Sequence, residues 1–362
     1  MQKNSIPDLI RTENILFETD ELMEEYKTYI EDYNFKEILQ AEQFIDKDGH
    51  ETKYVNDNVF NKEKERGRWN SNLKLYTASN LVSHSENCLI PFEPLVYCFN
   101  LNTHSFVWKD TRDIELYKYM DKEVIDKLVL PKEHKGILDI ITNNEILDNG
   151  SDIIKNKSGG SVLLNTGLAG LGKTLCAEIY SEIKRRPLYS IHSAQLGTNG
   201  SQIEKVLKES FERAERWNAV LLLEIADTYI RCRDNDVNYN AIVASFLRVL
   251  EYYKGILFMT SNREDDIDDA IISRSICWLK FKKPQEEERR AIWNIYIKQF
   301  NLPCDDELID KLVSEFDNVS GRDIKNISRL VSRYIQGYNI EKPTYENFSD
   351  CAIFRGVKAI TD

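Results

Sequence analysis

The sequence predicts an α/β protein in which a three-layer α/β/α domain with a parallel sheet is followed by a C-terminal α-helical lid and preceded by a small α+β N-terminal domain. Five short apolar runs lie between residues 161 and 281, and segments with helical periodicity separate them. This alternation is typical of strands that are buried on both faces of a parallel sheet. After Pro284 the apolar residues recur at helical spacing, so we expect a lid built of helices alone.

The first 130 residues carry both strand-like and helix-like patterns. Between Leu95 and Trp108 the segments VYCF and SFVW flank LNTH, which predicts a β-hairpin rich in strand-forming residues. An expected helix near the N-terminus has its apolar stripe at Leu22, Tyr26, Tyr29 and Ile30. We therefore predict an α+β domain over residues 1–130.

The five apolar runs of the central domain read SVLLN, PLYSIH, AVLLLEIAD, GILFMTSN and ICWLKF. Pro131 suits the first turn of a helix that precedes them, and an amphipathic helix over Ser201–Trp217 separates the second run from the third. We expect the α/β domain over residues 131–284, the lid over 285–345 and a C-terminal tail over 346–362.

Composition limits the function classes. The chain has 362 residues, and its seven scattered cysteines include no CxxC pair, which predicts free thiols in a reducing compartment. No apolar stretch approaches the ~20 residues of a membrane span, so we expect a cytoplasmic protein without a membrane contact. The net charge of −12 argues against a broad nucleic-acid surface, and we interpret the basic cluster Lys280–Lys283 as a solvated face.

The first run of the sheet ends in a loop with the spacing Gly167-x-x-x-x-Gly172-Lys173-Thr174. Glycines let consecutive backbone N–H groups curl around phosphates, the lysine neutralises β/γ charge, and the threonine hydroxyl ligates Mg²⁺. The segment after the loop has helical periodicity, so the phosphates would meet a helix N-terminus. We predict an ATP–Mg²⁺ site whose nucleotide-binding residues are Gly167, Leu168, Ala169, Gly170, Leu171, Gly172, Lys173, Thr174 and Leu175.

Four more segments follow this loop along the chain. They are the run Leu221–Asp227, the strand end Thr260-Ser261-Asn262, the segment Asp268–Arg274 and the segment Ser320–Asp323. Together with the loop they resemble the AAA+ ATPase family over about residues 130–345. The resemblance implies a P-loop NTPase fold in which the loop is Walker A and the four segments are Walker B, sensor 1, the arginine finger and sensor 2.

The resemblance also implies roles for four candidate catalytic residues. Glu224 would ligate Mg²⁺ together with Thr174, and Asn262 would hold a water or a γ-phosphate oxygen. Arg274 would contact the γ-phosphate of a neighbouring subunit, and Arg322 would couple the lid angle to the nucleotide. From the residues alone, Asn262 also fits a strand cap and Arg322 fits an ordinary surface arginine.

Two features depart from the family pattern. Members usually carry Asp-Glu in Walker B, whereas this chain has Glu224-Ile225, and Ile225 has no proton acceptor. Loss of a positioned general base typically lowers the rate roughly 10²- to 10⁴-fold, so we expect slow hydrolysis unless Glu224 or Asp227 substitutes. The loop after the second strand, His192–Gly200, lacks the aromatic residue that protein-unfolding members place in a pore, and we interpret His192 as a strand-end residue.

These observations predict an ATPase that couples the state of bound ATP to remodelling of an unknown protein partner, which the N-terminal domain would choose. The alternative is a nucleotide-held scaffold or sensor with little turnover, which the Glu224-Ile225 pair favours. A nucleic-acid motor or clamp loader is disfavoured by the acidic charge. The expected assembly is a homo-oligomeric ring, with a hexamer as the first expectation.

Overall fold

The computed structural model of the chain describes residues 43–46, 52–56, 95–110, 113–120, 129–130, 134–136, 138, 160–197, 200–224, 226–232, 237–263 and 266–357. The chain divides into two units, Met1–Lys118 and Tyr119–Asp362. Leu130, the last residue of the predicted N-terminal domain, is buried in the core of the second unit. None of the helices in the described ranges is long and apolar enough to cross a membrane.

The described part of the first unit is an antiparallel sheet with the strand order β4-β3-β2-β1-β5. Its strands are β1 (Gln43–Asp46), β2 (Lys53–Asn56), β3 (Leu95–Asn100), β4 (Ser105–Asp110) and β5 (Ile114–Leu116). The predicted hairpin is confirmed: β3 and β4 pair from Leu95 opposite Asp110 to Asn100 opposite Ser105. The Asn100 side chain accepts the N–H groups of Asn102 and Thr103 in the connecting turn. The predicted helix through Leu22 lies outside the described residues.

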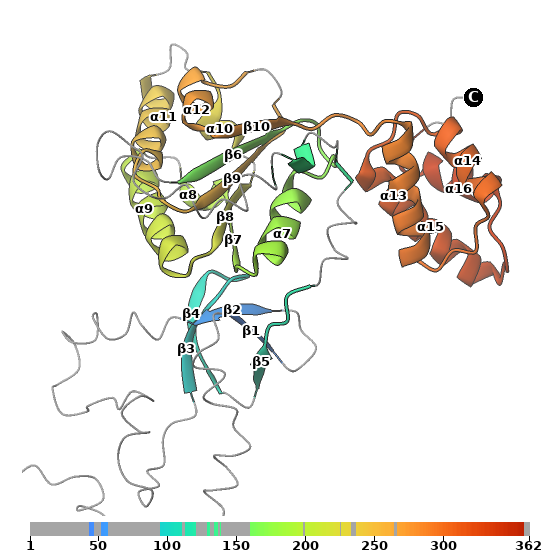
Figure 1. Ribbon diagram of the computed structural model, residues 1–362, viewed down its shortest axis with the longest axis horizontal. Coiled ribbons are helices and arrows are strands. Elements are labelled where there is room, and N and C mark those ends of the chain that lie inside the picture. The colour runs from blue at the N-terminus through green and yellow to red at the C-terminus, as the bar shows by residue number, and fades with distance from the viewer. Residues whose placement is uncertain are drawn as a thin grey trace, which may run out of the picture. The chain divides into compact units, whose positions relative to one another are not determined.

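The second unit contains a five-stranded parallel sheet with the order β10-β6-β9-β8-β7 (Figure 1). All five predicted apolar runs form its strands, which are β6 (Ser161–Thr166), β7 (Leu188–His192), β8 (Val220–Glu224), β9 (Ile256–Ser261) and β10 (Cys277–Lys280). The helices of this part are α7 (Lys173–Lys184), α8 (Ser193–Leu196), α9 (Gly200–Arg216), α10 (Asp227–Ile230), α11 (Val237–Leu250) and α12 (Asp269–Arg274). The amphipathic helix predicted over Ser201–Trp217 is α9.

Side chains that alternate along the strands divide this sheet into two buried faces. On one face Leu163, Leu222 and Phe258 pack against α7, whose Cys176 and Tyr180 are buried. Helices α9 and α11 lie on the other side of the sheet (Figure 1). The result is the predicted three-layer α/β/α arrangement, in which the three central strands, β6, β9 and β8, are almost entirely buried because both of their faces are covered.

The parallel register aligns the carboxyl ends of three strands at one edge. Thr166 at the end of β6 lies opposite Ser261 at the end of β9 and Lys280 at the end of β10. Loops that leave parallel strands at their carboxyl ends form the binding crevice of open α/β sheets. The predicted phosphate loop and Asn262 both follow these strand ends, so the register brings them together.

Within the described residues up to 357, the sheet is followed by the helices α13 (Glu286–Gln299), α14 (Asp306–Glu315), α15 (Gly321–Tyr338) and α16 (Tyr345–Ile353). The fully buried Trp293 packs against Phe348 of α16, with ring centroids 5.7 Å apart, and against Phe316. Most of α16 lies within the predicted tail over residues 346–362, and this helix is part of the lid core. This short helix begins at a Thr344 capping box and buries Phe348, Cys351 and Ala352.

The six cysteines in the described ranges are free. Burial raises the pKa of the Cys176 thiol to about 12, so this side chain stays neutral and serves as a small core residue. This agrees with the interpretation of the cysteines as free thiols.

Candidate active site

The phosphate loop follows β6, and the residues Asn165 and Gly167 constrain its backbone. The Nδ2 group of the fully buried Asn165 donates a hydrogen bond to the Lys173 carbonyl oxygen at 3.1 Å, which ties the end of β6 to the start of α7. Gly167 has φ +137°, and a Cβ atom there would collide with the Phe281 carbonyl oxygen. The glycine at position 167 is thus required by both backbone conformation and space.

Lys173, the first residue of α7, is buried and points back into the loop. Its Nζ donates hydrogen bonds to the carbonyl oxygens of Gly167 at 2.6 Å and Leu168 at 2.7 Å. A third hydrogen bond, at 3.0 Å, runs to Oδ1 of Asn262 at the end of β9. The ammonium group therefore lies where the loop, the start of α7 and the adjacent strand end meet.

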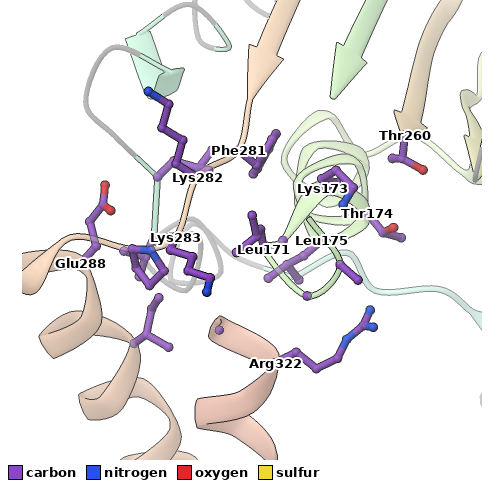
Figure 2. A pocket seen from close by; sticks show the side chains of 18 of the residues that line it. Leu171, Lys173, Thr174, Leu175, Thr260, Phe281, Lys282, Lys283, Glu288 and Arg322 are labelled. Atoms are coloured by element: carbon purple, nitrogen blue, oxygen red, sulfur yellow. The ribbon is translucent and has the colours of Figure 1, made fainter. Parts of the chain in front are cut away.

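A pocket of about 850 Å³ extends from this loop to the lid, a size typical of small-molecule sites (Figure 2). Most of the predicted site residues line it, namely Ala169, Gly170, Leu171, Gly172, Lys173, Thr174, Leu175, Glu224, Asn262 and Arg322. Gly167, Leu168 and Arg274 are not among the described residues of its lining. Among the lining side chains, Lys173, Lys280, Lys282, Lys283, Arg322 and Lys325 carry positive charge, whereas Glu178, Glu224 and Glu288 carry negative charge. This balance favours a polyanionic ligand.

The lid contacts the phosphate loop directly through the start of α15. The backbone N–H of Arg322 donates a hydrogen bond to the Gly170 carbonyl oxygen at 3.2 Å. Gly170 has φ +85°, and a Cβ atom there would lie 2.9 Å from both Ser320 Oγ and Arg322 Cβ. Figure 2 shows the Arg322 side chain reaching from α15 toward the start of α7. Loop and lid therefore meet backbone to backbone, and a larger residue at position 170 would separate them.

The β8 side of the pocket includes Glu224. Glu224, the last residue of β8, is partly buried, and its Oε1 accepts a hydrogen bond from Ser190 Oγ of β7 at 2.6 Å. Ile225 lies outside the described residues. Asp227 is not among the described residues of the pocket lining. Its Oδ1 instead accepts hydrogen bonds from Ser261 Oγ and from the Asn262 N–H.

Arg274 ends α12 and takes no part in the pocket of its own chain. Its Nη1 donates a hydrogen bond to the Ala270 carbonyl oxygen at 3.2 Å, and its Nη2 lies 3.8 Å from Oε2 of Glu251. Asp268 is the N-cap of α12, and its side chain accepts a hydrogen bond from the N–H of Ala270. A guanidinium on the surface has the placement that a contact with another molecule would need.

Sequence reasoning missed part of the site. The basic cluster Lys280–Lys283, interpreted as a solvated face, contributes Lys280, Lys282 and Lys283 to the pocket. The lid adds Ile292 and Tyr296, which have the helical spacing of ordinary core residues and so carried no signal. His192 is a strand-end residue as predicted, since its Nδ1 accepts the Ala194 N–H and caps α8.

The sheet and the glycine loop at the start of α7 define a nucleotide-binding protein of the P-loop class. Residues 163–283 match the model of the family described as "ATPase family associated with various cellular activities (AAA)", so this part of the chain is an AAA domain. The AAA domain implies that the chain binds ATP.

Two relatives share this part of the chain. It is 29% identical over 168 residues to a protein of Methanothermobacter marburgensis named "Putative 26S proteasome regulatory subunit homolog", which covers 44% of this chain and 45% of that protein. It is 32% identical over 135 residues to an uncharacterized AAA family ATPase of Sinorhizobium fredii, which covers 34% of this chain and 40% of that protein. The chain thus matches less than half the length of these relatives.

Two solved structures have the same fold. The FIGL-1 AAA domain matches with a TM-score of 0.51 and 17% sequence identity, covering 68% of this chain and 92% of that one. A chain of the E. coli MS115-1 HORMA:CdnC:Trip13 complex matches with a TM-score of 0.50 and 18% identity, covering 66% and 92%. At these identities the likeness concerns the fold.

Proposed function

We propose that this protein is an AAA ATPase that binds ATP with Mg²⁺, hydrolyses it slowly, and couples nucleotide state to a conformational change of a protein partner. The observation that carries this proposal is the hydrogen bond from the Arg322 N–H to the Gly170 carbonyl oxygen. It joins the lid to the loop that would hold the phosphates. Any shift of the loop on binding or release of a phosphate therefore acts on α15 without an intermediate element.

The residues present fit a magnesium ion. Thr174 and Glu224 both line the pocket and offer oxygen atoms, the ligand type that Mg²⁺ prefers. Bound there, the ion would neutralise phosphate charge, while Lys173 adds a second positive charge and Asn262 a polar contact at the end of β9. We propose Glu224, Asn262, Arg274 and Arg322 as the catalytic residues and Gly167–Leu175 as the nucleotide-binding loop.

Slow hydrolysis is proposed because Ile225 follows Glu224 where relatives carry the glutamate that polarises the attacking water. An aliphatic side chain cannot accept a proton. The same residue supports a second candidate function, a scaffold or sensor in which ATP holds an assembly together and little turnover occurs.

We further propose a homo-oligomeric ring, a hexamer as first expectation, in which Arg274 reaches the pocket of a neighbouring subunit. The surface position of Arg274, outside the pocket of its own chain, supports this arrangement. The first unit, with its antiparallel sheet, is proposed to choose the protein partner. The acidic net charge supports a protein rather than a nucleic acid in that role.

Phosphate release and particle mass, measured on the same samples with ATP, ADP and no nucleotide, separate the two candidate functions. A slow ATPase releases phosphate and gains mass with ATP, whereas a scaffold gains mass without release. Arg274→Ala is expected to abolish the ATP-dependent gain in mass while ADP still binds. A protein that stays monomeric at saturating ATP would contradict the ring, and one that binds no ATP would contradict both functions.

A further inference from the structure

The segment that follows β8 is hydrogen-bonded to the end of β9, mainly through the carboxylate of Asp227. Asp227, the first residue of α10, uses Oδ1 to accept a hydrogen bond from Ser261 Oγ at 2.5 Å and one from the Asn262 N–H at 3.0 Å. The preceding residue adds a third link, because the Ala226 N–H donates to the Thr260 carbonyl oxygen at 2.8 Å. Three consecutive residues of the strand end are thus fixed from the turn that follows β8.

Asn262 comes directly after the last residue of β9, where the hydrogen bonds of the sheet end, so the hydrogen bond to Asp227 is what fixes its backbone N–H. With its N–H held by Asp227, its side chain faces the pocket, and its Oδ1 accepts a hydrogen bond from Lys173 Nζ at 3.0 Å. The contacts therefore run from Asp227, outside the pocket, through Asn262 to the lysine of the phosphate loop.

We infer that Asp227 is a positioning residue: it sets the backbone at Asn262 so that the asparagine amide faces the phosphate loop, and it takes no proton from the attacking water. The inference rests on the proposed ATP hydrolysis at this site. Two observations support it. Asp227 is not among the described residues that line the pocket, and its Oδ1 already accepts two hydrogen bonds. Glu224, in contrast, lines the pocket.

Two substitutions at Asp227 separate positioning from proton transfer. Asp227→Asn keeps a side-chain oxygen that accepts both hydrogen bonds, but an amide does not act as a base. We expect Asp227→Asn to keep kcat within about threefold of the parent, and Asp227→Ala to lower kcat at least about tenfold, the effect of losing one hydrogen bond to a charged group. ATP affinity should change less than about threefold in both, since the loop itself is untouched. A kcat as low in Asp227→Asn as in Asp227→Ala would overturn the inference, because it would show that the carboxylate takes a proton.

Hydrogen exchange tests the hydrogen bond between the Asn262 N–H and Asp227 without nucleotide or turnover. The Asn262 amide is expected to exchange at least about tenfold faster in Asp227→Ala than in the parent, because loss of its acceptor exposes it to water. It should keep its protection in Asp227→Asn. Asp306→Ala, which removes an exposed acid from the first position of α14, is the matched control and should change neither exchange nor kcat.

The outcomes remain distinguishable. If the parent protein hydrolyses no ATP, the proposed function fails while the exchange measurement still decides whether Asp227 holds Asn262. Unchanged exchange in Asp227→Ala would overturn the inference even if kcat fell. Should Asp227→Ala fail to fold, Asp227→Asn compared with the parent still decides between a base and a positioning residue, since a base predicts a loss of kcat in that variant.

Discussion

The two sides of the pocket are built differently. On the phosphate-loop side, glycines at positions 167 and 170 have positive φ and close neighbours, and the buried Lys173 donates three hydrogen bonds. On the β8 side, Glu224 accepts one hydrogen bond from Ser190, and the next residue is an isoleucine. Under the proposed function, nucleotide binding would depend mainly on the phosphate-loop side and hydrolysis on the β8 side, so a change on one side should leave the other largely intact.

The strongest test of the phosphate-loop side is Lys173→Ala. We expect nucleotide affinity to fall at least about thirtyfold, because the change removes a charge from a buried, hydrogen-bonded position that would face the phosphates in the proposed site. Binding of a fluorescent ADP analogue, followed by titration, measures the effect. Lys205→Ala, which removes the same charge from an exposed position on α9, is the matched control and should bind like the parent. Equal affinity in Lys173→Ala and the parent would contradict the site assignment.

The β8 side is tested by restoring the residues of the family pattern. Ile225→Glu combined with Glu224→Asp is expected to raise ATP turnover at least about tenfold, the lower part of the range for a general base. Ile225→Gln is the control, since glutamine has nearly the same size as glutamate but does not act as a base. A parent that already turns over at about 1 s⁻¹, with no gain in the double variant, would contradict the idea that Ile225 limits hydrolysis.

The contact between loop and lid is tested by two glycines that share a positive φ. At Gly170 an added Cβ meets Ser320 and Arg322, whereas at Gly172, with φ +97°, it meets nothing within 4 Å. Gly170→Ala should therefore lower the free energy of unfolding by about 1–3 kcal/mol more than Gly172→Ala, the typical cost of overpacking. Urea denaturation without nucleotide measures the difference. Equal losses would show that backbone strain alone matters and that the lid does not press on position 170.

The same contrast between the two sides explains how much the sequence predicted. The strands and the phosphate loop were predictable because strand burial and phosphate binding leave local patterns, apolar runs in the one case and spaced glycines with Lys173 in the other. Helix α16 was missed because its nine residues are too few to show a clear period, and its burial depends on Trp293, some fifty residues earlier. The role of Asp227 could not be predicted, since it depends on the register that sets β8 beside β9.

The smallest expected effect lies at Ser190, whose hydroxyl donates the hydrogen bond to Oε1 of Glu224. Net, such a bond contributes about 1 kcal/mol, so Ser190→Ala should raise the Mg²⁺ concentration for half-maximal hydrolysis about fivefold. Because the hydroxyl orients Glu224 and contributes nothing to the phosphate loop, affinity for ADP without Mg²⁺ should stay unchanged. Ser190→Thr keeps the donor and should restore the parent's Mg²⁺ dependence. If the Mg²⁺ titrations of Ser190→Ala and the parent coincide, this result would contradict the proposal that Glu224, oriented by Ser190, is a metal ligand on the β8 side of the pocket.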